Sequence, residues 1–180
     1  MSNQLIETKR LILRPVRSTD FDALQAYRSL PKVYRYLVSG PKSEKDTKNF
    51  IKWASALMKK PVQTYVWAVT LKKTGQLIGD ANFNITHQTF REACIGYHFH
   101  PNFWGQGYAT EVTKELIQFG FKNLKMHRIF ATCDTKNIGS NKVLLKAGMK
   151  WEGTFRKNML QKGKWRDTNQ YAILSKVKPV

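Results

Sequence analysis

The residues with the clearest chemical pattern lie between His100 and Val112, in the segment HPNFWGQGYATEV. Gly105 and Gly107 stand between a predicted strand and a predicted helix, where the first N–H groups of the helix lack partners and carry partial positive charge. Glycine allows a positive φ and lets an anion approach the main chain without a Cβ in the way. The pattern therefore predicts a turn that binds phosphate oxygens. A plain strand-to-helix loop closed by glycines is the alternative, because such loops are common.

Two familiar phosphate motifs do not fit this segment. The P-loop needs Gly-x-x-x-x-Gly-Lys-Ser/Thr, and no glycine of the chain precedes a Lys-Ser/Thr pair in that frame. The dinucleotide pattern Gly-x-Gly-x-x-Gly begins at Gly105 and Gly107 but meets Thr110 in its third place. It also lacks the acidic residue expected about 20 residues further on, where Leu124 to Ile129 lie. These departures argue against a nicotinamide enzyme.

Metal and thiol chemistry find little support. His98 and His100 are two residues apart and would share one face of a strand, as pairs of metal ligands do, but no third ligand has a matching spacing. We therefore predict no metal site. Cys94 and Cys133 lie on apolar strands and are interpreted as buried thiols rather than nucleophiles. Two cysteines at this spacing match neither a disulfide framework nor a zinc module.

Length and composition predict one globular unit. The chain has 180 residues, of which 42% are hydrophobic and 12% aromatic. This is enough for a sizeable core, so we expect a single domain over residues 1–180 and no global disorder. The 31 Lys and Arg residues outnumber the 12 Asp and Glu residues, and the formal net charge is +19. That charge favours nucleic acid, an anionic cofactor or an acidic protein surface as partner.

The sequence shows no targeting or membrane signal. The start, MSNQLIETKR, has no apolar segment followed by a cleavage site of small residues. No apolar run approaches the ~18 residues of a membrane span. We therefore expect no membrane partner and a cytoplasmic location.

Hydrophobic periodicity predicts a mixed sheet with helices on its faces. Ser43 with Asp46 three residues later is a helix start, and the turn KKTGQ indicates a hairpin. The predicted strands cover 8–16, 65–71, 77–85, 92–100, 127–133, 151–156 and 168–175, and the predicted helices cover 19–28, 43–60, 109–121 and 140–147.

The segment IGYHFHPNFWGQGYATEV resembles the coenzyme A loop of the GNAT N-acetyltransferases, and in particular of the Rim-type branch, which acetylates the N-termini of ribosomal proteins. The superfamily pattern for this loop is Gln/Arg-x-x-Gly-x-Gly/Ala. Gly107 and Ala109 match it, and Trp104 replaces its first residue, as is usual in the Rim-type branch. Further matches cover nearly the whole chain, in order: TKRLILRPV at 8–16, Asn137 to Ser140, Leu145 to Met149, Glu152-Gly153, and Asp167 ahead of Tyr171.

The resemblance implies an α/β GNAT fold: a central mixed, mostly antiparallel sheet of about six or seven strands, with splayed parallel central strands and helices on both faces. It also implies an N-acetyltransferase that uses acetyl-CoA and no metal. Acetyl-CoA would bind between the splayed strands, 94–100 and 127–133, with the backbone of Phe99 and His100 paired to its pantetheine arm. Asn137 and Ser140 would face the thioester. The amides that would hold the pyrophosphate belong to Gly105, Gln106, Gly107, Tyr108, Ala109 and Thr110.

The catalytic residues are less clearly marked. Acetyl transfer needs a neutral amine, a donor for the developing oxyanion and an acid for the leaving thiolate. Many relatives place a tyrosine acid seven residues after the Asn, where this chain has Leu144. Ser140 is then the candidate acid, with a helix N-cap as its alternative role. Some relatives carry a carboxylate base where this chain has Met159. His98 or Glu92 is the candidate base, and a hydrogen-bonded strand histidine is the alternative that we favour for His98.

The missing carboxylate base bears on the acceptor. Near pH 7.4, deprotonating a lysine of pKa ~10.4 costs roughly 4 kcal/mol, whereas an α-amine of pKa ~7.8 costs about 0.5 kcal/mol. A site without a strong base can therefore still acetylate an N-terminal α-amine, which favours that acceptor over a lysine side chain. A net charge of +19 would also repel polyamines and aminoglycosides, but not neutral or zwitterionic amines.

Three functions follow from these observations. The first is an N-terminal acetyltransferase of ribosomal proteins, and the second is a small-molecule amine or antibiotic N-acetyltransferase on the same fold. The third is a non-catalytic RNA-binding module, which the lack of an RNP, KH or helix-turn-helix signature disfavours. Residues 136–178 hold 11 Lys and Arg but only two acids, so they form either a solvated basic surface or a docking face for ribosomal RNA or an acidic protein. The chain would act as a monomer or a homodimer.

Overall fold

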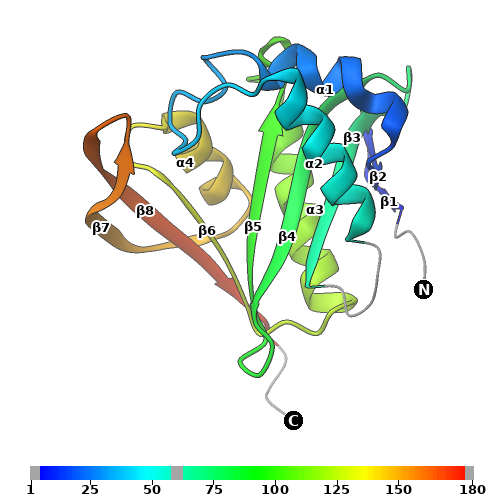
Figure 1. Cartoon of the computed structure of the whole chain (residues 1–180). Coiled ribbons are helices and arrows are strands. Elements are labelled where there is room, and N and C mark those ends of the chain that lie inside the picture. The colour runs from blue at the N-terminus through cyan, green and yellow to red at the C-terminus, as the bar shows by residue number, and fades with distance from the viewer. Residues whose placement is uncertain (1–4, 58–62, 177–180) are drawn as a thin grey trace.

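Eight strands form one continuous sheet in the computed structural model, which describes residues 5–57 and 63–176 (Figure 1). The strand order is β1-β2-β3-β4-β5-β6-β8-β7, and within it β5 and β6 are parallel while the other neighbours are antiparallel. The predicted class, a mostly antiparallel mixed sheet with helices on both faces, is confirmed. The strands are β1 (Ile6–Glu7), β2 (Leu11–Pro15), β3 (Thr64–Leu71), β4 (Leu77–His87), β5 (Glu92–Phe99), β6 (Arg128–Asp134), β7 (Lys150–Gln161) and β8 (Lys164–Leu174). The helices are α1 (Phe21–Arg28), α2 (Glu44–Ala56), α3 (Tyr108–Lys122) and α4 (Ile138–Lys146).

The sheet differs from the prediction at its two edges. An eighth strand, β1, is added by two residues, of which Ile6 pairs with Leu13 of β2. β7 and β8 are longer than predicted and meet in a hairpin at Lys162 and Gly163, whose φ values are 49° and 74°. Two successive positive φ values match the twist of a tight hairpin, so pairing continues up to the turn. The predicted end of the second helix, residues 58–60, lies outside the described residues.

The helices divide between the two faces of the sheet. Figure 1 shows α1 and α2 in front of it and α3 behind it. β4 alternates between the faces: Ala81 and Phe83 belong to the larger core with α3 and α4, whereas Asp80 contacts Tyr27 of α1 on the other face. No helix of the described residues is long and apolar enough to cross a membrane. The sheet is therefore covered on both faces and presents polar side chains on the α1 face at β4.

Gly120 lets α3 pack closely on the sheet. A Cβ at this position would lie 2.6 Å from Cδ1 of Ile129 and 2.7 Å from Cε2 of Phe83, and both side chains are fully buried. We expect Gly120→Val to lower the free energy of unfolding by about 1–3 kcal/mol, because the core must open to admit the added methyl groups. Urea denaturation measures this change. Gly153→Val is the control, since a Cβ there meets no atom within 4 Å. Equal midpoints for Gly120→Val and the native chain would contradict the packing.

Candidate functional site

The two parallel strands at the centre of the sheet separate part-way along their length. β5 and β6 pair from Glu92 with Arg128 to Cys94 with Phe130, and both strands continue beyond the last pair (Figure 1). On its other side β5 stays paired with β4 up to Phe99. Because backbone groups alternate along a strand, those of Ile95, Tyr97 and Phe99 face the split. The split therefore presents an open strand edge in the middle of the sheet, which an extended ligand can pair with.

His100 does not contribute its backbone to this edge, which corrects the expectation from the sequence. Its N–H donates to the carbonyl of Ile78 (2.8 Å), and its carbonyl accepts from the N–H of Phe103 (2.9 Å). The carbonyl of Phe99 is also engaged, because it accepts from the indole N–H of Trp104 (2.9 Å). The open edge thus consists of the carbonyl of Ile95, the N–H and carbonyl of Tyr97, and the N–H of Phe99. Trp104 supports the strand end and does not reach toward a ligand with its N–H.

The glycine segment forms a turn with free amides. Gly105 and Gly107 have φ values of 76° and 82°, and Gly107 is the N-cap of α3. The first N–H that returns to the turn is that of Glu111, which donates to the carbonyl of Gly107 (3.0 Å). Among the described residues, no acceptor is bonded to the backbone N–H groups of Gly105, Gln106, Gly107, Tyr108, Ala109 or Thr110. This is the arrangement that binds phosphate oxygens at the start of a helix.

Arg10 and Glu111 hold the main chain of the glycine turn in place. Arg10 Nε lies 2.7 Å from Glu111 Oε2, and Arg10 Nη1 donates to the carbonyl of Gln106 (3.0 Å). The guanidinium also lies over the ring of Tyr108, 4.3 Å from its centroid. Burial alone would raise the pKa of Glu111, but hydrogen bonds from Thr8 and Arg10 lower it overall. Neither Arg10 nor Glu111 was predicted as a site residue from the sequence.

A cavity of about 330 Å³ occupies the split on the side of α4 and the segment that follows α1. It brings together Asn137, Ser140 and His98, which were predicted as site residues from separate segments. Its other walls come from three residues after α1, from the β7–β8 hairpin and from Leu144 of α4. The lining residues are Tyr36, Leu37, Val38, Asn82, Cys94, Ile95, Gly96, Tyr97, His98, Ala131, Thr132, Cys133, Asp134, Asn137, Ser140, Leu144, Met159 and Thr168.

His98 is paired with a buried carboxylate. Asp80 lies directly opposite it across the β4–β5 ladder, and Asp80 Oδ1 is 3.2 Å from His98 Nδ1. The Tyr27 hydroxyl donates to Asp80 Oδ2, and Arg28 Nη1 lies 3.7 Å from the same oxygen. With Nδ1 directed at the carboxylate, Nε2 is the ring nitrogen that remains to accept a proton. His98 and Asp80 therefore have the arrangement of a base and the group that orients it.

Asp80 stays ionised in this network. Burial alone would raise its pKa, but the charges of His98 and Arg28 and the hydrogen bonds from His98 and Tyr27 lower it below the usual value. A carboxyl group with a lowered pKa stabilises the fold above the unfolded pKa of ~3.9 and loses that contribution as the pH falls. At neutral pH the carboxylate is therefore available to hold His98.

Glu92, the other predicted base, is not at the cavity. It lies where β5 and β6 are still paired, with its Oε2 3.2 Å from Nε of Arg128 and its Oε1 accepting from Thr86 (3.1 Å). Arg128 also binds Glu152 of β7 at 2.6 Å. These three side chains join β5, β6 and β7 at the narrow end of the split. Of the two predicted bases, only His98 lines the cavity.

Asn137, and not Ser140, caps α4. The side chain of Asn137 accepts from the backbone N–H of Ser140 (3.2 Å), and Asn137 is the N-cap residue. Ser140 stands inside the first turn and lines the cavity. The structure thus removes the N-cap alternative for Ser140. It adds a neighbour that the sequence did not single out, Tyr97, because a tyrosine on an apolar strand is most simply interpreted as core.

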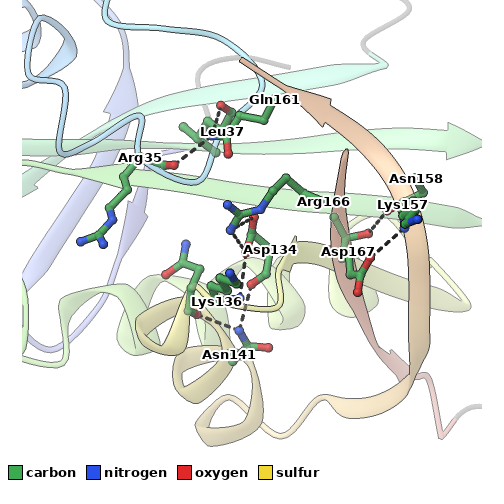
Figure 2. A network of polar contacts seen from close by, with 12 residues as sticks. Arg35, Leu37, Asp134, Lys136, Asn141, Lys157, Asn158, Gln161, Arg166 and Asp167 are labelled. Atoms are coloured by element: carbon green, nitrogen blue, oxygen red, sulfur yellow. Dashed lines mark hydrogen bonds and ion pairs between the residues drawn. The ribbon is translucent and has the colours of Figure 1, made fainter. Parts of the chain in front are cut away.

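The outer wall of the cavity is tied together by side chains from distant segments (Figure 2). Gln161 donates to the carbonyls of Arg35 (2.9 Å) and Leu37 (2.6 Å), which joins the segment after α1 to the β7–β8 hairpin. Arg166 of β8 lies 2.9 Å from both oxygens of Asp134. Asp134 is the one carboxylate among the described lining residues, so its charge is already neutralised.

The split sheet with its cavity, and the turn of free amides at the start of α3, fit a transferase that takes its acyl group from coenzyme A. The family described as "Acetyltransferase (GNAT) domain" matches residues 10–150, and the chain belongs to this family. It is an N-acetyltransferase, and its acyl donor is acetyl-CoA. Among the described residues, no group of three or more His, Cys, Asp or Glu side chains is placed to hold a metal ion.

Relatives match over almost the full length. The protein named "Uncharacterized N-acetyltransferase YnaD" of Bacillus subtilis is 36% identical over 171 residues, which cover 94% of this chain and 96% of that protein. A GNAT-family acetyltransferase structure from Bacillus anthracis has a TM-score of 0.85 and 32% identity, and covers 95% of this chain and 98% of that one. A Vibrio cholerae structure described as a "putative ribosomal-protein-serine acetyltransferase" has a TM-score of 0.79 and 25% identity. The match covers 97% of this chain and 100% of that one.

Proposed function

We propose that this enzyme acetylates the N-terminal α-amine of a protein, and that ribosomal proteins are the substrate class. The observation that carries this proposal is the chemistry of the cavity. It offers a histidine oriented by Asp80, and its one carboxylate, Asp134, is already paired with Arg166. The described residues that line the cavity thus offer no unpaired carboxylate with which to hold a polycationic amine. The cavity suits an acceptor amine whose deprotonation costs little free energy near neutral pH.

The donor would be held mainly by the main chain. The free amides from Gly105 to Thr110 fit a pyrophosphate, and the open edge at Ile95 and Tyr97 fits the extended pantetheine arm. When bound, acetyl-CoA supplies an activated acyl group. Asn137 holds the first turn of α4, so that Ser140 faces the cavity. A single domain over residues 1–180 would contain all of these parts.

His98 would act as the base. With Asp80 at Nδ1, its Nε2 accepts the proton that the acceptor amine loses. From the ordinary pKa values, an imidazole takes a proton from an α-ammonium group at a cost of about 2 kcal/mol and from a lysine ammonium at about 5 kcal/mol. The difference of about 3 kcal/mol favours the α-amine. The preference for the α-amine agrees with the sequence, which has Met159 where some relatives carry a carboxylate base.

The Rim-type resemblance and the similarity to the Vibrio cholerae structure support a ribosomal-protein acceptor. The positive charge supports association with ribosomal RNA or another acidic surface, because exposed basic residues line the β7–β8 hairpin: Lys150, Arg156, Lys157, Lys162 and Lys164. A small neutral or zwitterionic amine is the second candidate acceptor. The volume of the cavity, about 330 Å³, favours that candidate because it falls in the range of small-molecule pockets.

A peptide panel tests the proposal. We expect peptides that begin with Ser or Met and have a free N-terminus to be acetylated with a kcat/KM at least ~100-fold above that of the same peptides with a blocked N-terminus and an internal lysine. Mass spectrometry of the products locates the acetyl group. Amino-acid esters, spermidine and an aminoglycoside are assayed beside the peptides. Acetylation of lysine at equal rates, or of the small amines alone, would contradict an N-terminal protein acceptor.

A further inference from the structure

Tyr97 carries a buried hydroxyl that the acceptor chemistry does not use. Its ring packs against the core at Phe99, with 6.1 Å between the ring centroids, and the residue lines the cavity. The hydroxyl oxygen is buried and has no hydrogen-bond partner among the described residues. Buried tyrosine hydroxyls normally find a partner in the folded protein. An unpartnered one at a substrate cavity points to a partner that arrives with the substrate.

The neighbours of the hydroxyl come from α4 and β6, the elements that line the cavity opposite β5. The Ser140 side chain approaches it as a hydrogen-bonding neighbour and lowers its pKa, and Cys133 raises that pKa, while no described residue completes a hydrogen bond of ordinary geometry with it. Ser140 is free to interact with it, because Asn137 already caps the helix. The backbone of Tyr97 belongs to the open strand edge of β5. One residue therefore offers its main chain and its hydroxyl to the same split.

The cavity creates a need for a proton donor. Cys94 and Cys133 line it, and burial raises the pKa of both thiols to about 11 from the ordinary value of 9.0. The same surroundings thus disfavour a thiolate by about 100-fold. Cleavage of a thioester in this cavity would release its sulfur into those surroundings. A proton donor positioned beside the sulfur neutralises the negative charge of the leaving thiolate as that charge forms.

We propose that Tyr97 is the general acid of acetyl transfer and that Ser140 orients its hydroxyl. As the amine nitrogen bonds to the acetyl carbon and the C–S bond breaks, the electron pair of that bond goes to sulfur and Tyr97 gives its proton to it. His98 takes the proton that the amine loses and then releases it to solvent, and the Tyr97 phenolate takes a proton back from solvent through Ser140, so that both residues return to their starting states. The products are the N-acetylated amine and CoA thiol. This proposal rests on acetyl transfer from acetyl-CoA and not on the identity of the acceptor.

The acid–base state of Tyr97 suits this role. Burial raises its pKa to about 12, and the Ser140 side chain offsets part of that rise. The hydroxyl therefore keeps its proton over the whole working pH range. Ser140 alone is a poorer donor, because an aliphatic hydroxyl is a much weaker acid than a phenol. The arrangement of the two residues makes Tyr97 the donor and Ser140 its support.

Tyr97→Phe tests the proposal, because it removes one oxygen and keeps the ring. We expect kcat to fall about 100-fold, while calorimetry gives a Kd for acetyl-CoA within about threefold of the native value. A second readout needs no turnover: the thiolate absorbance of bound CoA, followed against pH, reports the pKa of its thiol. We expect that pKa to rise by about one unit in Tyr97→Phe, because the thiolate loses a hydrogen-bond donor.

Two further variants sharpen the result. Ser140→Ala should lower kcat less than Tyr97→Phe does. Tyr65→Phe is the matched control: Tyr65 packs beside Trp67 on β3, does not line the cavity and should keep native kinetics. An unchanged kcat in Tyr97→Phe would overturn the proposal. So would a lower kcat accompanied by an unchanged thiol pKa, since that result assigns Tyr97 a packing role. Both outcomes are independent of which amine the enzyme prefers.

Discussion

Replacing Gly107 with glutamate is expected to raise the Kd for acetyl-CoA about 100-fold or more. Gly107 has a φ of 82° and lies among the free amides of the turn. A side chain strains this backbone, and a carboxylate takes the place that the amides offer to phosphate oxygens. A 100-fold loss corresponds to about 3 kcal/mol. Isothermal calorimetry with the purified chain measures it directly.

Two variants separate charge from strain in this result. Gly107→Ala keeps the strain without the charge and should cost about 1–2 kcal/mol, or roughly tenfold in Kd. Gly75→Glu adds the same side chain at a glycine with a φ of 72° in the β3–β4 turn, where a Cβ meets no atom within 4 Å. That variant should bind acetyl-CoA normally. A native Kd for Gly107→Glu would show that the turn does not hold the pyrophosphate.

Removing the imidazole of His98 is expected to have the second large effect. His98→Ala should lower kcat/KM for a peptide α-amine about 10²–10⁴-fold near neutral pH, because the amine loses its general base. Affinity for acetyl-CoA, measured by calorimetry, should change little. The loss should shrink as the pH rises toward the pKa of the amine, since more of the acceptor is then neutral without help.

The control for this variant is His87→Ala. His87 lies at the end of β4, stacks on Phe90 and does not line the cavity, so its removal should leave the kinetics unchanged. His98→Gln keeps a polar side chain facing Asp80 and should be as inactive as His98→Ala. If His98→Gln regained most of the native rate, the imidazole would serve to satisfy Asp80 and not to accept a proton.

Local signals in the sequence predicted most of the fold. Ser43 caps α2 as expected, since its hydroxyl accepts from the N–H of Asp46 (3.2 Å), and the glycine segment starts α3 at Tyr108. What the sequence could not predict is where pairing stops. The split depends on β5 and β6 parting after Cys94 and Phe130, and both strands remain regular beyond that point. No residue type marks the last pair.

The functional site could be predicted only in part, because some of its contacts are local in the sequence and others form only when distant strands pair. The amides of the glycine turn follow from local backbone geometry, so the sequence located them. The pairing of His98 with Asp80 depends on the register of β4 with β5, and that of Arg10 with Glu111 joins residues 101 positions apart. The resemblance assigned the backbone of His100 to the ligand, whereas its N–H bonds to the carbonyl of Ile78, a contact that arises only in the assembled sheet. Tyr97 was not predicted, because a tyrosine on an apolar strand is interpreted as a core residue and the sequence does not show that its hydroxyl lacks a partner.

The two hydrogen bonds that Gln161 donates to carbonyl oxygens bear on how acceptor preference can diverge among these enzymes. The amide holds the main chain of residues 35 and 37, so the tether is indifferent to which side chains stand there. Evolution or a protein engineer can therefore exchange the side chains at 35–38 while the scaffold beneath them persists. We expect such exchanges to reshape the cavity wall at Tyr36, Leu37 and Val38 while the parting strands and the glycine turn stay as they are.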